Sequence, residues 1–304
     1  MILANPALMV MACSLAAGVW MLLRPADPAA LKVLLFSLFT LVFGITALLV
    51  LGAANTALPL KFDCYLYLID KALGGSPAFP AGRLVRGALW KVLLVIYNSM
   101  PAVMIVWYGM NLRRRNGRAA LIAFAVNLLI GSCLYLVTPA CGPAFAFASR
   151  FPGDPGAVAV QLIKVDASPN AIPSLHVSSA ILFVLLAGRH AGARAFAWLY
   201  LAGTIAATLV LGEHYLIDLA LAAPFASFAA LLAQGKTRRA LGNLALVIAW
   251  LLAIRFVTPL MIAHPIALRT AVAATIFVAL VALQHERATR NKPAEQPLVS
   301  PSHA

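Results

Sequence analysis

Charged side chains are scarce in this sequence, and acidic ones are the scarcest. Asp, Glu, Lys and Arg make up only 11% of the 304 residues, and just 9 of them are acidic. In their place, 63% of the residues are hydrophobic and the mean hydropathy is +0.93. This composition excludes a soluble globular protein and indicates an integral membrane protein.

Cysteine is also rare, with four residues in the chain. Cys13 and Cys133 fall inside apolar runs, where we expect inert packing residues. Cys64 and Cys141 fall in segments that the topology below places on the outer side of the membrane. An oxidising compartment would allow these two to form a disulfide, but a single pair of cysteines is weak evidence for one.

Long apolar runs predict an all-α, polytopic membrane protein. Runs of about 17 to 25 residues with few charges are typical of membrane-spanning helices. We predict nine of them, with eight as the alternative count, at residues 7–23, 31–55, 92–111, 119–138, 175–188, 195–212, 216–234, 241–263 and 268–284. The first run lacks a basic segment before it and a cleavage site after it, so we interpret it as a helix and not as a signal peptide.

The net charge of the chain is +14, and the basic residues lie mainly in short loops between the predicted helices. One alternating set of loops carries 14 of the 23 basic residues: Arg24, Lys32, Arg113, Arg114, Arg115, Arg118, Arg189, Arg194, Lys236, Arg238, Arg239, Arg287, Arg290 and Lys292. Only Asp27, Glu286 and Glu295 accompany them. The positive-inside rule makes this face cytoplasmic, so topology explains the charge and no nucleic-acid partner is required. We expect a bacterial inner membrane protein.

Residues 61–90 differ from the membrane-spanning runs that flank them. Phe62, Leu66, Ile69 and Leu73 recur with the period of one helical face, while Asp63, Asp70 and Lys71 fall elsewhere on the helical wheel. This pattern predicts a short amphipathic helix lying on the outer membrane interface, either as a surface strap or as a gate beside the site. We therefore divide the chain into anchors (1–60), an interfacial segment (61–90), a catalytic membrane core (91–235) and two extra helices with a basic tail (236–304).

The third predicted span contains the polar residues Tyr97, Asn98 and Ser99, followed by Pro101. Polar groups at this depth usually bond to neighbouring helices or accommodate a proline kink. We interpret this patch as a structural contact between helices.

A loop of about 30 residues follows Pro139, which is long for a connection between membrane helices and indicates a functional or disordered segment. Arg150 and Lys164 lie in this loop, on the face that the charge bias leaves poor in basic residues. They are candidates for binding an anion, and the alternative is that they are simply solvated.

The segment Asn170-Ala-Ile-Pro-Ser-Leu-His176 leads into an apolar helix. Pro173 suits the first helical turn, and Ser174 beside it offers a hydroxyl group. Because free N–H groups and the helix dipole attract anions at a helix start, His176 is placed where a phosphate would bind.

A second polar boundary carries Glu213-His214-Tyr-Leu-Ile-Asp218. His214 and Asp218 are four residues apart and share one helical face, so the carboxylate would fix the tautomer of the ring and increase its basicity. His214 would then attack phosphorus and His176 would protonate the leaving alkoxide. This site requires no metal or cofactor. Each residue alone would be explained by an interfacial or pairing role.

These residues resemble a known family. Pro-Ser-Leu-His at 173–176 is similar to the Pro-Ser-x-His motif of the type 2 phosphatidic acid phosphatase superfamily, and His214-x-x-x-Asp218 to the end of its third motif. The resemblance covers roughly residues 90–235 and implies a six-helix core. It also implies that His214 is the phosphorylated nucleophile, Asp218 its orienting partner and His176 the general acid.

Two departures indicate a branch within that superfamily. Its phosphatases have Ser-Arg where this chain has Ala207-Thr208, and their first motif, Lys followed by Arg-Pro, is not evident. Without these cations, the motifs of this chain resemble those of the inositol phosphorylceramide synthase and sphingomyelin synthase branch. The sequence does not decide which cations replace the missing ones, and the candidates are Lys164, Arg150, Arg255 and Arg269. Ser174 is a candidate for a further phosphate ligand.

The sequence thus predicts a membrane enzyme that transfers the phospho-headgroup of a phospholipid to a lipid alcohol at the outer leaflet. Hydrolysis of a lipid phosphate, with water as acceptor, is the alternative. A transporter with a His/Asp proton relay is a further alternative. The chain shows no internal repeat, and the ionisable residues lie at one boundary and not at mid-membrane, which disfavours that alternative.

Overall fold

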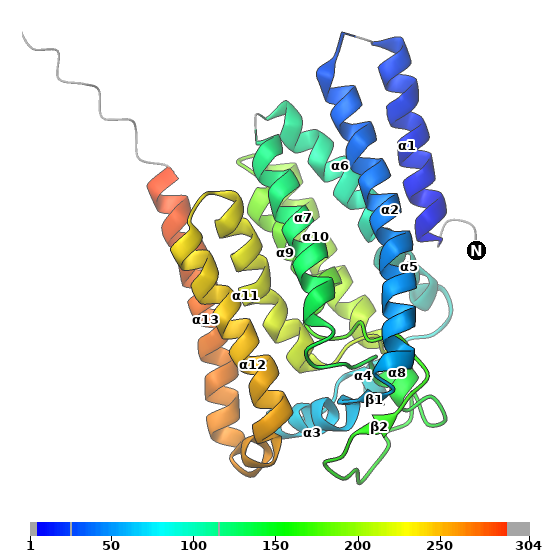
Figure 1. Cartoon of the computed structure of the whole chain (residues 1–304), viewed down its shortest axis with the longest axis vertical. Helices are drawn as coiled ribbons and strands as arrows, with labels where there is room; N and C mark the ends of the chain where they lie inside the picture. The colour runs from blue at the N-terminus through cyan, green and yellow to red at the C-terminus, as the bar shows by residue number, and fades with distance from the viewer. Residues whose placement is uncertain (1–4, 25, 115, 291–304) are drawn as a thin grey trace, which may run out of the picture.

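A computed structural model describes residues 5–24, 26–114 and 116–290. Arg115 and Lys292 of the predicted cytoplasmic set, and Glu295, lie outside these ranges. The described chain is almost entirely helical (Figure 1). The helices are α1 (Pro6–Leu23), α2 (Pro28–Ala57), α3 (Asp63–Leu73), α4 (Ala78–Leu84), α5 (Gly87–Asn98), α6 (Met100–Arg113), α7 (Gly117–Leu134), α8 (Pro143–Ala146), α9 (Leu175–Leu186), α10 (Ala191–Val210), α11 (Leu216–Ala233), α12 (Thr237–Ala263) and α13 (Pro265–Arg290).

Each of the nine predicted apolar runs is helical, but fewer helices are long enough to span a membrane. Among the described residues, six helices have the necessary length and composition, or seven if the bent pair α5–α6 is one span. Helix α9 falls below that limit, since it has only 12 residues and is therefore about 18 Å long, and the apolar part of α13, Pro265–Val281, is also too short. The predicted count of nine spans is not confirmed, whereas the prediction of an all-α polytopic membrane protein agrees with the structure.

Local sequence explains where several helices begin or bend. Asn5 and Asp27 accept hydrogen bonds from the first turns of α1 and α2, and each precedes a proline, a residue that favours the first helical position. The third predicted span is broken between α5 and α6, which meet at 52° around Ser99. Pro101 in the first turn of α6 lacks the N–H that would continue the α5 hydrogen-bond ladder.

Helix α11 is the centre of the packing. It contacts α7, α9, α12 and α13, and most of its side chains are buried. One apolar cluster connects it with α6, α7, α9 and α10, and another connects it with α3 and α12. The N-terminal hairpin α1–α2 packs against α6 at the edge of this bundle (Figure 1).

The long loop after α7 is ordered by contacts at one end of the bundle. Its strand β2 (Ile163–Lys164) pairs antiparallel with β1 (Leu60–Lys61). Figure 1 shows β1, β2, α3, α4 and α8 together at the end opposite the α1–α2, α6–α7 and α11–α12 connections. Lys71 and Tyr67 on α3 both bond to Asp154 in the loop, at 2.5 and 2.6 Å.

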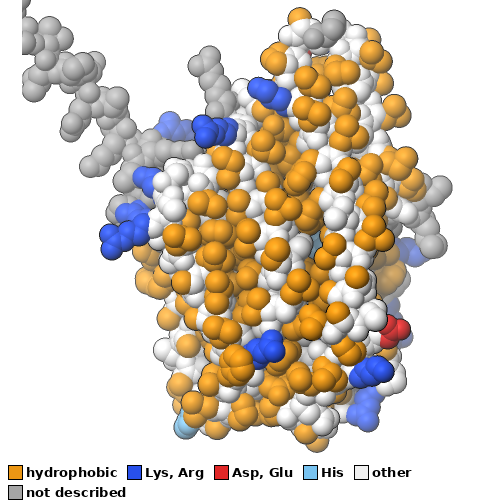
Figure 2. All heavy atoms as spheres, in the orientation of Figure 1, with side chains coloured by type: hydrophobic (Ala, Val, Ile, Leu, Met, Phe, Trp, Pro, Cys, Tyr) orange, Lys and Arg blue, Asp and Glu red, His pale blue; other side chains and the backbone are white. Residues whose placement is uncertain are grey.

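The outer surface has the character of a membrane protein. Figure 2 shows hydrophobic side chains over the middle of one face, with Lys and Arg mostly toward the two ends. Cys64 and Cys141 are both buried as free thiols, so the disulfide considered from the sequence is absent.

Candidate active site

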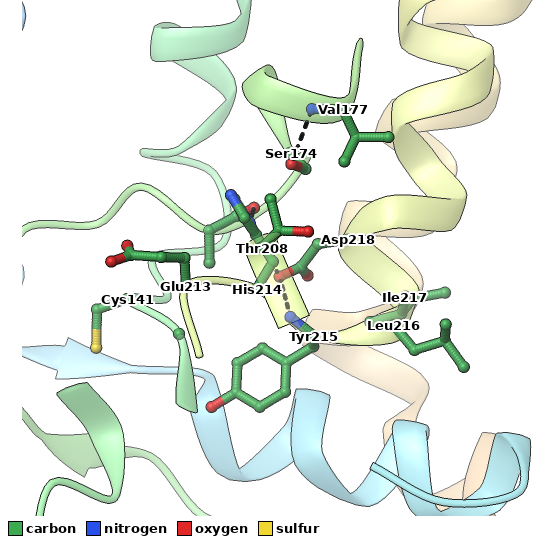
Figure 3. A network of polar contacts seen from close by, with 12 residues as sticks. Cys141, Ser174, Val177, Thr208, Glu213, His214, Tyr215, Leu216, Ile217 and Asp218 are labelled. Atoms are coloured by element: carbon green, nitrogen blue, oxygen red, sulfur yellow. Dashed lines mark hydrogen bonds and ion pairs between the residues drawn. The ribbon is translucent and has the colours of Figure 1, made fainter. Parts of the chain in front are cut away.

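His176 is the second residue of α9 and so lies in the first turn of the helix, as the sequence predicts. The helix begins at Leu175 and Ser174 is its N-cap, with its hydroxyl oxygen accepting from Val177 N at 3.3 Å (Figure 3). Pro173 therefore precedes the cap and does not occupy the first helical turn. A buried serine engaged in capping has less capacity to bind substrate than the sequence suggested.

His214 has its tautomer fixed by a backbone carbonyl. Its ring Nδ1 lies 2.8 Å from the carbonyl oxygen of Ala171, and the side chain is almost completely buried. A carbonyl oxygen only accepts, so Nδ1 carries the proton and Nε2 keeps its lone pair. This is the state in which an imidazole can attack an electrophile through Nε2.

Asp218 lies near His214 but is not its closest partner. Its Oδ2 is 3.6 Å from His214 Nδ1, an ion-pair distance beyond normal hydrogen-bond length. The same oxygen accepts from Tyr215 N at 2.8 Å, which caps the start of α11, and Oδ1 is buried without a partner (Figure 3). The carboxylate thus acts on His214 mainly through its charge, which would stabilise a cationic ring.

The two histidines face one another from different helices. Their ring centroids are 6.4 Å apart, with an angle of 58° between the ring planes. Tyr97 stacks on His176, with centroids 3.8 Å apart and planes 15° from parallel, and its hydroxyl lies 3.5 Å from Glu213 Oε2. Tyr97 was interpreted from the sequence as a contact between helices, and in the structure it also fixes the ring plane of His176.

Backbone contacts hold the two histidine segments in register. The N–H groups of Asn170 and Ala171 both donate to Ala140 O, and Ser174 N donates to the carbonyl of Asp218 at 3.3 Å. Gly142 also lies close by; a Cβ there would come within 2.3 Å of Glu213 O, and its φ of +92° favours glycine. The loop after α7 therefore supports both sides of the site.

Two buried carboxylates on α3 hold the start of α11. Asp70 accepts from Leu216 N at 2.8 Å and Ile217 N at 3.1 Å, and Asp63 accepts from the Tyr215 hydroxyl at 2.9 Å and from Gly142 N at 3.0 Å. Both side chains are completely buried. The polar side of α3 thus faces the protein, and α3 is not simply an interfacial strap. The positive end of α11 is already neutralised by these acids.

Burial raises the pKa of several acids outside the membrane-spanning helices. It raises the pKa of Asp63 to about 6, although hydrogen bonds from Tyr215, Cys141 and Gly142 oppose the shift. It also raises the pKa of Asp70 and of Glu213. These directions mean that the folded protein binds protons that the unfolded chain releases.

The raised pKa of Asp63 predicts a pH-dependent stability. Because the folded-state value exceeds the unfolded one, Asp63 contributes stability below about pH 4 that is lost as the pH rises through about 6, on the order of 3 kcal/mol. Unfolding in detergent, followed by tryptophan fluorescence at pH 4 and pH 7, should show wild type losing more stability than Asp63→Asn. An identical loss in both proteins would contradict this assignment.

The candidate cations lie away from the histidines. Arg150 and Lys164 line one pocket in the loop region, and Arg150 donates to Pro155 O. Arg255 donates to Val137 O at 2.7 Å and lies over the Phe62 ring, while Arg269 donates to Ala72 O at the end of α3. The structure brings His176, His214 and Asp218 together, but it does not bring these four cations to them.

Thr208 occupies the position where the resembling phosphatases have arginine. It is buried, and its hydroxyl donates to Ile205 O within α10. Glu213 N donates to the Thr208 carbonyl, so this part of α10 supports the loop that carries His214. The residues that the structure describes contain no group of three or more His, Cys, Asp or Glu side chains that could hold a metal ion.

Comparison with known proteins agrees with the motifs. A family model described as the PAP2 superfamily matches residues 65–233, more than half of the chain. The chain belongs to the PAP2 superfamily. The match begins within α3 and ends with α11, so the α1–α2 hairpin and both α12 and α13 lie outside it. Neither a curated protein nor a solved structure matches the chain.

Family membership indicates the general type of enzyme but not its specific reaction. It supports a membrane enzyme of the lipid phosphatase or phosphotransferase type, acting on a phosphate ester in a lipid substrate. The motif at Pro173 to His176 and the motif at His214 to Asp218 both lie within the matched region.

Proposed function

We propose that this protein transfers a phospho-headgroup from a phospholipid to a lipid alcohol through a phosphohistidine on His214. The observation that carries the proposal is the arrangement of the two imidazoles. His214 Nδ1 is engaged by Ala171 O, leaving Nε2 as the reactive nitrogen, and the ring of His176 lies across from it at 6.4 Å between centroids.

In the first step, His214 Nε2 donates its lone pair to phosphorus as the bond from phosphorus to the lipid oxygen breaks. Protonated His176 gives its proton to the departing alkoxide, which leaves as a neutral lipid alcohol. The Asp218 carboxylate, 3.6 Å from His214 Nδ1, stabilises the positive charge that forms on the ring. The product is a headgroup phosphate bonded to His214 nitrogen.

In the second step, neutral His176 takes the proton from the hydroxyl of a second lipid alcohol. That oxygen attacks phosphorus, the P–N bond breaks, and the bonding pair returns to His214 Nε2. The new phosphodiester departs and His176 is protonated again, so the enzyme is ready for the next donor.

The charges around the site favour a phosphodiester over a phosphate monoester. A monoester carries almost two negative charges at neutral pH, since its second pKa is about 6, whereas a diester carries one. Glu213 and Asp218 lie beside His214, and Thr208 stands where the phosphatases have arginine. A site with this charge balance repels a dianion more than a monoanion. This supports the headgroup-transfer branch, in the style of inositol phosphorylceramide synthase, over hydrolysis of phosphatidic acid.

The reaction is proposed to occur at the outer leaflet of a bacterial inner membrane. The α1–α2, α6–α7 and α11–α12 connections, which carry many of the predicted cytoplasmic basic residues, lie at the end opposite the loop that supports the site (Figure 1). The positive-inside rule then places the histidines toward the outside.

An acceptor assay tests the proposed reaction. Purified protein in lipid vesicles should convert a phosphodiester lipid only when a lipid alcohol is supplied, and should release little inorganic phosphate from phosphatidic acid. Free phosphate release that is independent of the acceptor would contradict transfer and support hydrolysis, because water would then reach the phosphohistidine.

A further inference from the structure

A groove of about 210 Å³ runs from His176 along the inner face of α2. Five residues of α2 line it, at positions 40, 43, 44, 47 and 51, which is the spacing of one helical face. The opposite wall comes from α5, α6, α7 and α9. Helix α2 packs on α6 and α1, and its Gly44 and Ala47 leave this side open. The wall formed by α2 lies outside the region that matches the family.

The groove is lined mainly by apolar side chains, with a smaller number of polar ones. Phe43, Leu51, Met104 and Leu128 supply apolar side chains, and among the described residues no Lys or Arg lines it. His176, Tyr97 and Asn170 are among its polar residues, and the amide oxygen of Asn170 is buried without a hydrogen-bond partner. A buried acceptor of this kind indicates a ligand that brings a donor.

We propose that this groove binds the hydrocarbon chain of the lipid alcohol that leaves from, or adds to, the phosphorus. The inference rests on the proposed function, because His176 protonates the oxygen of that alcohol and its chain must begin beside His176. The hydroxyl group donates to the Asn170 amide oxygen or to His176, and the chain extends along α2. The exposed apolar residues on the outer side of α2, such as Ile45, Leu48 and Leu49, place the groove at the height of the lipid chains.

Gly44 offers a way to fill the groove without disturbing the helix. A Cβ at Gly44 would have no atom within 4 Å, so a leucine side chain there would extend into open space. Gly52 provides a matched control, since it lies on the same helix, a Cβ there also meets nothing within 4 Å, and it does not line the groove. Both substitutions replace glycine in a helix by leucine, so their effects on helix stability are alike.

The test compares wild type, Gly44→Leu and Gly52→Leu on lipid alcohol acceptors with long and short chains. Gly44→Leu should lower kcat/KM for the long-chain acceptor by about 10-fold, the loss expected for about two unburied methylene groups, and leave the short-chain acceptor unaffected. Gly52→Leu should behave as wild type with both. If Gly44→Leu also behaves as wild type with both, the groove proposal is overturned while the proposed transfer reaction stands.

Photolabelling gives a second measurement that requires no turnover. A diacylglycerol with a diazirine in its acyl chain should label the peptide containing residues 28–57 in wild type and in Gly52→Leu, and much less in Gly44→Leu. Equal labelling of all three proteins would overturn the groove proposal. Labelling as expected in a protein without transferase activity would support the binding site and contradict only the proposed reaction.

Discussion

Replacing His214 with glutamine should reduce headgroup transfer by on the order of 10⁴-fold or more, because it removes the nitrogen that we propose forms the bond to phosphorus. Glutamine is close to histidine in size and polar, so the contact with Ala171 O can be kept. The measurement is the initial rate of transfer in vesicles, at equal amounts of folded protein.

His190→Gln is the matched control for this substitution. His190 is exposed at the start of α10, and its side chain makes no capping hydrogen bond. Its replacement should leave the rate unchanged. A His214→Gln protein that keeps more than a tenth of the wild-type rate would contradict the assignment of His214 as nucleophile.

Replacing His176 with glutamine should have an effect that depends on the leaving group. For a lipid substrate the leaving alkoxide is strongly basic and needs a proton, so the rate should fall by about 10²- to 10⁴-fold. A p-nitrophenyl phosphodiester releases a much weaker base and should lose far less. The measurement is the ratio of the two rates in wild type and in His176→Gln.

An equal loss for both substrates would show that His176 only shapes the site. Tyr97→Phe serves as the control here, because it keeps the ring stacked on His176 and removes only the hydroxyl near Glu213. That variant should show the wild-type ratio of the two rates.

Much of the architecture follows directly from the sequence. All nine apolar runs form helices, and two short motifs about 40 residues apart come together because α9 and α11 pack side by side. The predicted number of membrane spans is not confirmed, because hydropathy reports apolarity and not the length of a helix. Helix α9 begins where the apolar run begins, at Leu175, but it ends at Leu186 after only 12 residues.

The sequence carries a signal for the positions of Asp63 and Asp70. They are seven residues apart, so they share one side of α3 and border its apolar face. Such a position favours contact with the protein as much as with water. The partners of Asp70 are the N–H groups of Leu216 and Ile217, and Asp63 accepts from the Tyr215 hydroxyl. These groups are about 150 residues away and carry no sequence signature.

The motifs could not predict the backbone partner of His214 or the roles of the distant arginines. The group nearest to His214 Nδ1 is the carbonyl of Ala171, and a carbonyl is present at every residue. Arg255 and Arg269 have the charge that a phosphate site needs, but the packing of α12 and α13 against α3 directs both to backbone carbonyls. Charge type alone could not distinguish these roles.

The most direct test of the account is to trap the covalent intermediate. Protein incubated with a donor phospholipid labelled at phosphorus, without acceptor, and then denatured in alkali should retain label that is stable to base and released by acid, as expected for a phosphorus–nitrogen bond. Mass spectrometry should locate the label on His214, and His214→Gln should carry none. Turnover of the same lipid with no label on this residue, or with label on another residue, would contradict the account.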